Sequence, residues 1–108
     1  MSKFLAEFEL YVMLAVARLG GEAYGVSIRR EIESRPGRPV SVGALYATLA
    51  RLGDKGLMKF EVSEPRPVPG GRARKYCRLT PQGRAALEHS TSMLARMMDG
   101  VNLAEERG

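Results

Sequence analysis

Reactive side chains are scarce in this sequence of 108 residues, which has one cysteine, Cys77, one histidine, His89, and no tryptophan. A single cysteine cannot form an internal disulfide, and one cysteine with one histidine does not make the ligand set of a zinc site. No pair of carboxylates or nucleophile–base set occurs at catalytic spacing. We therefore expect a protein of a reducing cytoplasm, with no enzymatic activity, no metal and no cofactor.

Long hydrophobic runs are also absent. The run LYVMLAVA, residues 10–17, is far shorter than the ~20 residues that a helix needs to cross a bilayer. The same run superficially resembles a secretion signal, but Glu7 and Glu9 lie where the apolar segment of a signal would begin. We therefore expect neither a membrane partner nor a cleaved leader.

Acidic residues are missing from one window of the chain. The sequence has 17 Lys and Arg against 12 Asp and Glu, a formal net charge of +5. No Asp or Glu occurs from Pro65 to Leu87, and this window contains Arg66, Arg72, Arg74, Lys75, Arg78 and Arg84. A local positive patch of this kind favours an anionic partner.

What is present is the composition of one folded domain, 44% hydrophobic and 27% charged. Hydrophobic spacing predicts a first helix over residues 4–19, ended by Gly20 and Gly21. This helix has two apolar stripes, more apolar surface than one small core needs; one stripe consists of Phe4, Phe8, Tyr11 and Ala15. A second amphipathic helix is predicted over residues 24–34, and the sequence RPGRP at 35–39 ends it.

A third helix is predicted to begin after Ser41, whose hydroxyl suits an N-cap. Its apolar residues recur at spacings of 3, 4 and 3 and are expected to face the core: Val42, Leu45, Leu49 and Leu52. The opposite face is expected to point outward and consists of Ser41, Ala44, Ala47, Thr48, Arg51 and Lys55. Tyr46 lies at the edge of the apolar stripe, where its ring packs or its hydroxyl reaches a phosphate.

Two strands and a last helix complete the predicted order. The sequence LMKFEVSE, residues 57–64, and the sequence ARKYCRL, residues 73–79, alternate apolar and polar side chains. We therefore expect a hairpin with residues 65–72 as its tip and with Cys77 buried. Thr80 and Pro81 predict the start of a helix that runs to about Asn102. Its apolar seam is expected to be Leu87, Leu94, Met97 and Val101.

This order, helix–helix–helix–strand–strand–helix, is mostly α with a small β-hairpin and is typical of a winged helix-turn-helix. In that fold the third helix enters the major groove of DNA and the hairpin contacts the neighbouring backbone. Small side chains at Ala44 and Ala47 would let the helix backbone approach the groove, and Thr48 and Arg51 would reach base edges. Phosphates would be neutralised by cations of the hairpin, namely Arg66, Arg72, Arg74 and Lys75.

Three stretches of the sequence together resemble the PadR family of bacterial and archaeal transcriptional regulators. They are YGVSIRREIE, SVGALYATLARLGDKGLM and GGRARKYCRLTPQGRAAL, and the resemblance covers roughly residues 8–90. The chain departs from the family pattern at Val42 and Ala47, where the family often has proline, so its base contacts are expected to differ.

The resemblance implies a homodimer that represses transcription by binding a palindromic operator on double-stranded DNA. It also implies that the first and last helices build the dimer interface, and that a small-molecule effector binds there. A last helix of ~22 residues would be about 33 Å long, too long for so small a core to cover. We therefore expect the interface to contain Phe4, Phe8, Tyr11, Leu87, Leu94, Met97, Met98 and Val101.

These expectations divide the chain into a DNA-binding part, residues 1–84, and a dimerisation helix with its tail, residues 85–108. One alternative of another class stays open on the sequence alone. In that alternative the winged helix is a protein-interaction module, and its basic wing docks on an acidic partner protein rather than on DNA.

Overall fold

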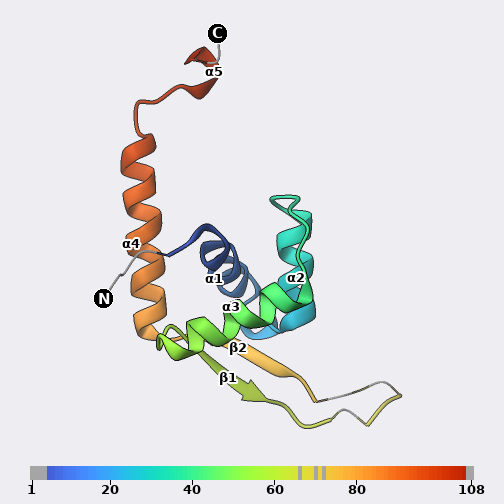
Figure 1. The fold of residues 1–108 in the computed structure, drawn as a ribbon. Helices are drawn as coiled ribbons and strands as arrows, with labels where there is room; N and C mark the ends of the chain where they lie inside the picture. The colour runs from blue at the N-terminus through green and yellow to red at the C-terminus, as the bar shows by residue number, and fades with distance from the viewer. Residues whose placement is uncertain (1–4, 66, 70, 72, 107–108) are drawn as a thin grey trace.

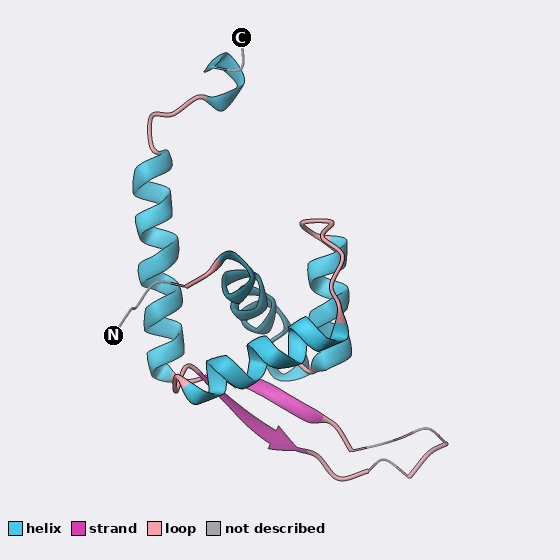
Figure 2. Cartoon of the chain, viewed as in Figure 1, coloured by secondary structure: helices cyan, strands magenta, loops and turns pink. Residues whose placement is uncertain are grey.

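The computed structural model describes residues 5–65, 67–69, 71 and 73–106. Three helices precede an antiparallel hairpin, and a long helix follows it, so the predicted order is confirmed (Figures 1 and 2). A 3₁₀ turn after the first helix and a short last helix were not predicted. The elements are α1 (Glu7–Leu19), η1 (Gly20–Glu22), α2 (Gly25–Ser34), α3 (Val42–Asp54), β1 (Met58–Val62), β2 (Lys75–Leu79), α4 (Pro81–Met98) and α5 (Leu103–Glu106).

Side-chain caps fix the starts of α3 and α4 as the sequence predicts. The Ser41 Oγ accepts a hydrogen bond from the Ala44 N–H at 3.1 Å, and the Thr80 Oγ1 accepts one from the Gly83 N–H at 2.9 Å. Pro81 lies in the first turn of α4, where its missing N–H has no cost. These local bonds set where α3 and α4 begin.

The core is formed where α1, α2 and α3 meet the hairpin. Its largest fully buried apolar side chains are Val12, Met13, Ile28, Ile32, Leu45, Leu52 and Cys77. Burial of Cys77 is confirmed, and this burial raises the pKa of its thiol to about 11, so the thiol stays protonated near neutral pH. The prediction that Val42 faces the core is wrong, because its side chain is 49% exposed.

The hairpin is joined to the helical part through the connection between α1 and α2. Met58 pairs with Leu79 and Val62 with Lys75 at the two ends of the ladder. The Cys77 N–H donates to the Ala23 carbonyl at 2.8 Å, and Tyr24 and Tyr76 form an isolated bridge. The wing therefore has a fixed base.

The last helix differs from the prediction in its length and in one buried residue. It ends at Met98 rather than near Asn102, because Gly100 turns the chain with φ of 81° before α5 begins. Leu87, which the sequence places in the dimer interface, is only 7% exposed and packs into the core of its own chain.

Beyond Leu87, α4 leaves the core. Figure 1 shows its C-terminal half and α5 projecting away from the other helices. The apolar side chains of this projecting part are largely exposed; they are Met93, Leu94, Met97, Met98, Val101 and Leu103. Such an apolar arm has no cover within its own chain among the described residues.

The base of α4 is fixed to the start of the hairpin by close backbone contacts. The Thr80 Oγ1 donates to the Gly56 carbonyl at 2.6 Å, and the Thr80 N–H donates to the Leu57 carbonyl at 3.2 Å. Gly83 lies directly against Leu57, since a Cβ at Gly83 would be 1.9 Å from the Leu57 carbonyl oxygen. Only glycine fits at this position without a shift of the backbone.

We predict that Gly83→Ala lowers the free energy of unfolding by about 1–3 kcal/mol, because the added methyl group meets backbone that must move. The matched control is Gly43→Ala, also in the first turn of a helix, where an added Cβ meets nothing within 4 Å. That variant should be as stable as the wild type or more stable by up to about 1 kcal/mol. Urea titration measures both, and equal stability of the two variants would contradict the proposed contact.

Candidate nucleic-acid interface

The exposed face of α3 is made of very small side chains. Gly43, Ala44, Ala47 and Ala50 are all exposed, and they recur at the spacing of one helix face. The buried residues of the same helix, Leu45, Thr48, Leu49 and Leu52, lie on the opposite side. We call the four small residues the small-residue face; along it another molecule could approach the helix backbone closely.

This face is rotated about the helix axis relative to the sequence prediction. Thr48 was expected to point outward, but it is 2% exposed, and its outward placement is wrong. Leu45, Thr48, Leu49 and Leu52 are all buried and form a wider stripe than the leucines alone. Val42 moves outward for the same reason. The contact of Thr48 with bases, as predicted from sequence, therefore has no support in this arrangement.

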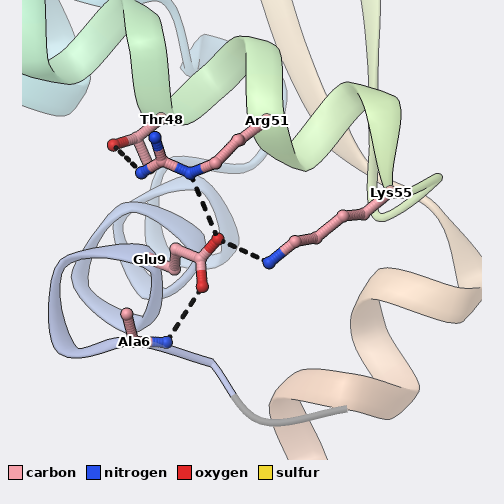
Figure 3. A network of polar contacts seen from close by, with 5 residues as sticks. All are labelled: Ala6, Glu9, Thr48, Arg51 and Lys55. Carbon is pink, nitrogen blue, oxygen red and sulfur yellow. Dashed lines mark hydrogen bonds and ion pairs between the residues drawn. The ribbon is translucent and has the colours of Figure 1, made fainter. Parts of the chain in front are cut away.

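One flank of the small-residue face carries Arg51 and Lys55, and both are paired with a carboxylate of α1 (Figure 3). The Lys55 Nζ lies 2.9 Å from the Glu9 Oε2, and the Arg51 Nε lies 3.8 Å from the same oxygen. The other carboxylate oxygen of Glu9 accepts a hydrogen bond from the Ala6 N–H at 2.9 Å. Both cations are exposed, as predicted, whereas Glu9 is only 3% exposed.

The surroundings of Glu9 keep it ionised despite its burial. Burial by itself raises the pKa of a carboxyl group, because the charged form loses its hydration. The hydrogen bonds from Lys55 and Ala6, with the positive charges of Lys55 and Arg51, outweigh burial and hold the pKa of Glu9 below its usual 4.5. Glu9 therefore links α1 to α3 as a charged acceptor.

The other flank of the small-residue face carries Tyr46 and Lys75. Tyr46 is 51% exposed, and its hydroxyl lies against Gly25 at the start of α2, where a Cβ would come within 2.4 Å of the oxygen. The Lys75 Nζ lies 4.5 Å from the centre of the Phe60 ring. These side chains surround a small cavity of about 50 Å³ beside Ala50. A cation and a hydroxyl are thus placed next to α3 on the hairpin side.

The remaining predicted contacts lie at the N-terminus of α3 and in the wing. Ser41 is exposed, although its hydroxyl is used as the N-cap. Arg74 lies over the Tyr24 ring, its guanidinium carbon 4.4 Å from the ring centre, so it is attached to the base of the wing. Arg66 and Arg72 lie outside the described residues.

Of the predicted interface residues in α1, Phe8 and Tyr11 are half-buried against the core. The Arg38 guanidinium covers both rings, at 5.0 Å from Phe8 and 5.8 Å from Tyr11, and pairs with Glu7 at 2.9 Å. Phe4 lies outside the described residues. The exposed apolar surface of the described chain is therefore concentrated on α4 rather than on α1.

Sequence reasoning missed three residues of this site: Gly43 and Ala50 on the exposed face and Glu9 beneath it. The spacing of 4 and 3 between Gly43, Ala47 and Ala50 was a signal for the first two. Glu9 had no comparable signal, because its partners on α3 are distant in sequence and only the fold brings them together.

None of the helices in the described part of the chain combines the length and apolarity that a bilayer crossing requires.

Residues 13–89 match the family described as the Transcriptional regulator PadR-like family. Over 76 residues the chain is 46% identical to Transcriptional regulator Rv3488 of Mycobacterium tuberculosis, a match that covers 70% of this chain and 66% of that protein. The chain thus spans just under two thirds of that relative.

Solved structures with the same fold include two from the same family. A PadR-like transcription factor from Bacteroides fragilis has a TM-score of 0.68 and 28% identity, covering 83% of this chain and 82% of that one. A PadR family transcriptional regulator from Eggerthella lenta has a TM-score of 0.65 and 30% identity, covering 86% of this chain and 82% of that one.

We predict that Glu9→Gln lowers the free energy of unfolding near neutral pH by about 1 kcal/mol, because the charge that pairs with Lys55 and Arg51 is lost. The loss is this small because both cations are exposed and stay hydrated without the carboxylate. The stabilisation from ionised Glu9 is complete above the unfolded-state pKa near 4.5 and is lost as the pH falls through the lower folded-state pKa. The stability difference between wild type and variant should therefore shrink between pH 6 and pH 3, as measured by urea titration. A difference independent of pH would contradict this role.

Proposed function

Because this chain belongs to the PadR-like family of transcriptional regulators, we propose that it represses transcription in the cytoplasm as a homodimer bound to a palindromic operator. Members of this family are DNA-binding regulators and not enzymes. The repressor role, the palindrome and the dimer are our proposals for this chain.

The observation that carries the proposal is the shape and charge of α3. Its small-residue face allows the helix backbone to approach the floor of a major groove, which admits an α-helix. Lys55 on one flank and Lys75 on the other are exposed cations suited to the two phosphate backbones, and Arg51 beside Lys55 is suited to a base edge. Small side chains between cationic flanks are the arrangement that a groove-binding helix requires.

The dimer is proposed from the apolar arm of α4. Met97 is 76% exposed and Leu94 54%, on a helix that extends beyond its own core. A second copy of the chain with the same arm would cover these side chains in a twofold interface. Two copies of α3 would then read successive major grooves, about 34–36 Å apart.

We keep the division into a DNA-binding part, residues 1–84, and a dimerisation part, residues 85–108, as a proposal about roles. The boundary lies inside the continuous helix α4, and Leu87 still belongs to the core of the first part. A rigid helix across the boundary would transmit the geometry of the dimer to the DNA-binding part.

We also propose that a small-molecule effector binds at the dimer interface and modulates DNA binding. A supporting feature is an open groove of about 210 Å³ between α1 and α2, beside Tyr11 of the expected interface. It presents Tyr11, Leu14 and Ile32, and its two arginines, Arg18 and Arg35, are both paired with Glu31, so a largely apolar molecule suits this lining.

We predict that the protein prefers a duplex from its own upstream genomic region to a random duplex, with affinities that fall log-linearly with salt. Arg51→Ala should weaken binding to the upstream duplex by about 1–3 kcal/mol, and should weaken binding to the random duplex by less. Lys75→Ala should weaken both equally and reduce the salt slope by about one. Gel shift and fluorescence anisotropy measure these quantities.

Lys59→Ala is the matched control, because Lys59 is exposed and lies next to Phe60 on β1. Side chains alternate along a strand, so Lys59 faces away from α3, against which the Phe60 ring packs at Gly53. It should change affinity less than Lys75→Ala. Weak retention on any duplex at low salt would refute DNA binding and favour a wing that docks on an acidic protein.

We predict that Met97→Glu weakens dimerisation at least about tenfold, because the interface would bury an unpaired charge. Val62→Glu is the control, since Val62 is 73% exposed on the hairpin and lies outside α4. Sedimentation velocity should show wild type and Val62→Glu as dimers at micromolar concentration and Met97→Glu shifted to monomer. A monomeric wild type would exclude the proposed dimer.

A further inference from the structure

The Arg51 side chain makes one hydrogen bond and one longer ion-pair contact, although 57% of it is exposed. Its Nη2 donates a hydrogen bond to the Thr48 Oγ1 at 3.1 Å, and its Nε faces the Glu9 carboxylate at 3.8 Å. Among the described residues, nothing bonds to its Nη1. Figure 3 shows the guanidinium close to Thr48 and Glu9, with one nitrogen joined to the Thr48 hydroxyl and another to the Glu9 carboxylate by dashed lines.

The two residues that hold Arg51 are themselves fixed. Thr48 is 2% exposed in the buried stripe of α3, and Glu9 is 3% exposed on α1. The Ala6 N–H holds one oxygen of Glu9, and the Lys55 Nζ contacts the other at 2.9 Å. Lys55 makes the close contact with this carboxylate, and Arg51 makes only the longer one at 3.8 Å. The exposed guanidinium of Arg51 can therefore also bind an outside acceptor.

We propose that Glu9 and Thr48 are positioning residues for Arg51, which hold its guanidinium so that its free edge meets an acceptor in the DNA groove. This inference rests on the DNA-binding function proposed above. A long side chain that is already held in its bound orientation loses less conformational freedom on binding. The planar fork of arginine also makes its orientation decisive for a bond to a base or a phosphate.

For the loss of Glu9, the proposal predicts weaker binding to the preferred duplex, whereas the change in net charge alone predicts stronger binding. Removing a carboxylate beside the DNA surface raises the net positive charge and should strengthen binding to every duplex. If Glu9 instead positions Arg51, its loss should weaken binding to the preferred duplex in spite of the added charge. Thr48→Val gives a second test without a charge change, since valine has nearly the shape of threonine and lacks only the hydroxyl.

The experiment compares Thr48→Val and Glu9→Gln with wild type on the upstream duplex and on a random duplex of equal length, by fluorescence anisotropy at one salt concentration. Loss of the hydrogen bond between Thr48 and Arg51, or of the contact between Glu9 and Arg51, should weaken binding to the upstream duplex about threefold to tenfold. The random duplex should bind Thr48→Val as it binds the wild type. In an Arg51→Ala background Thr48→Val should have no further effect, which a merely structural role of Thr48 would not produce.

Two matched controls separate positioning from general effects. Thr91→Val removes a hydroxyl that donates to the Leu87 carbonyl on α4, far from α3, and should leave both affinities unchanged. Glu33→Gln makes the same change in net charge on α2, where Glu33 pairs with Arg29, and should not weaken either duplex. Urea titration establishes that each variant is folded at the assay temperature.

A second readout needs no DNA. In the free protein the Arg51 Nη2 protons, one of which is donated to the Thr48 Oγ1, should exchange with water more slowly than those of a free arginine. Thr48→Val should remove this protection in the ¹H–¹⁵N spectrum of the guanidinium group, and Glu9→Gln should reduce it. Unchanged duplex preference in both variants, or stronger binding of Glu9→Gln to both duplexes, would overturn the positioning role alone. A wild type that prefers neither duplex would overturn the proposed function, and the inference with it.

Discussion

The rotation of α3 about its own axis is the constraint on which the rest of this molecule depends. The same helix supplies Leu45, Leu49 and Leu52 to the core and presents the small-residue face on its other side. A buried stripe that fixes the helix against α1 and the hairpin therefore also fixes which residues a groove would meet. The core and the proposed reading surface cannot change independently.

The charges around α3 follow from that rotation. With Thr48 turned inward, Arg51 and Lys55 lie on the side of α3 nearest α1, where both contact the buried carboxylate of Glu9. A buried carboxylate is tolerable only when it is paired and hydrogen-bonded, and here three groups satisfy it. The result is a charged contact between α1 and α3 that leaves a net positive edge on the outside.

Local signals explain how much of the fold could be predicted from the sequence. Caps at Ser41 and Thr80, strand alternation and the buried Cys77 depend on near neighbours, so the order of elements and the family resemblance could be found in the sequence. The inward turn of Thr48 could not, because stripes with and without it both have helical spacing and only packing chooses between them. The partners of Glu9 could not either, because the fold alone joins them.

The central claim is that the small-residue face of α3 enters the major groove in two copies related by a dimer axis. A hydroxyl-radical-generating iron chelate attached at Asp54→Cys, on the exposed end of α3, tests it directly, because the native Cys77 is buried and escapes labelling. On the upstream duplex the account predicts two groups of cleaved positions, one helical turn or about 10 base pairs apart. Cleavage spread evenly along the duplex, or confined to a single group, would contradict it.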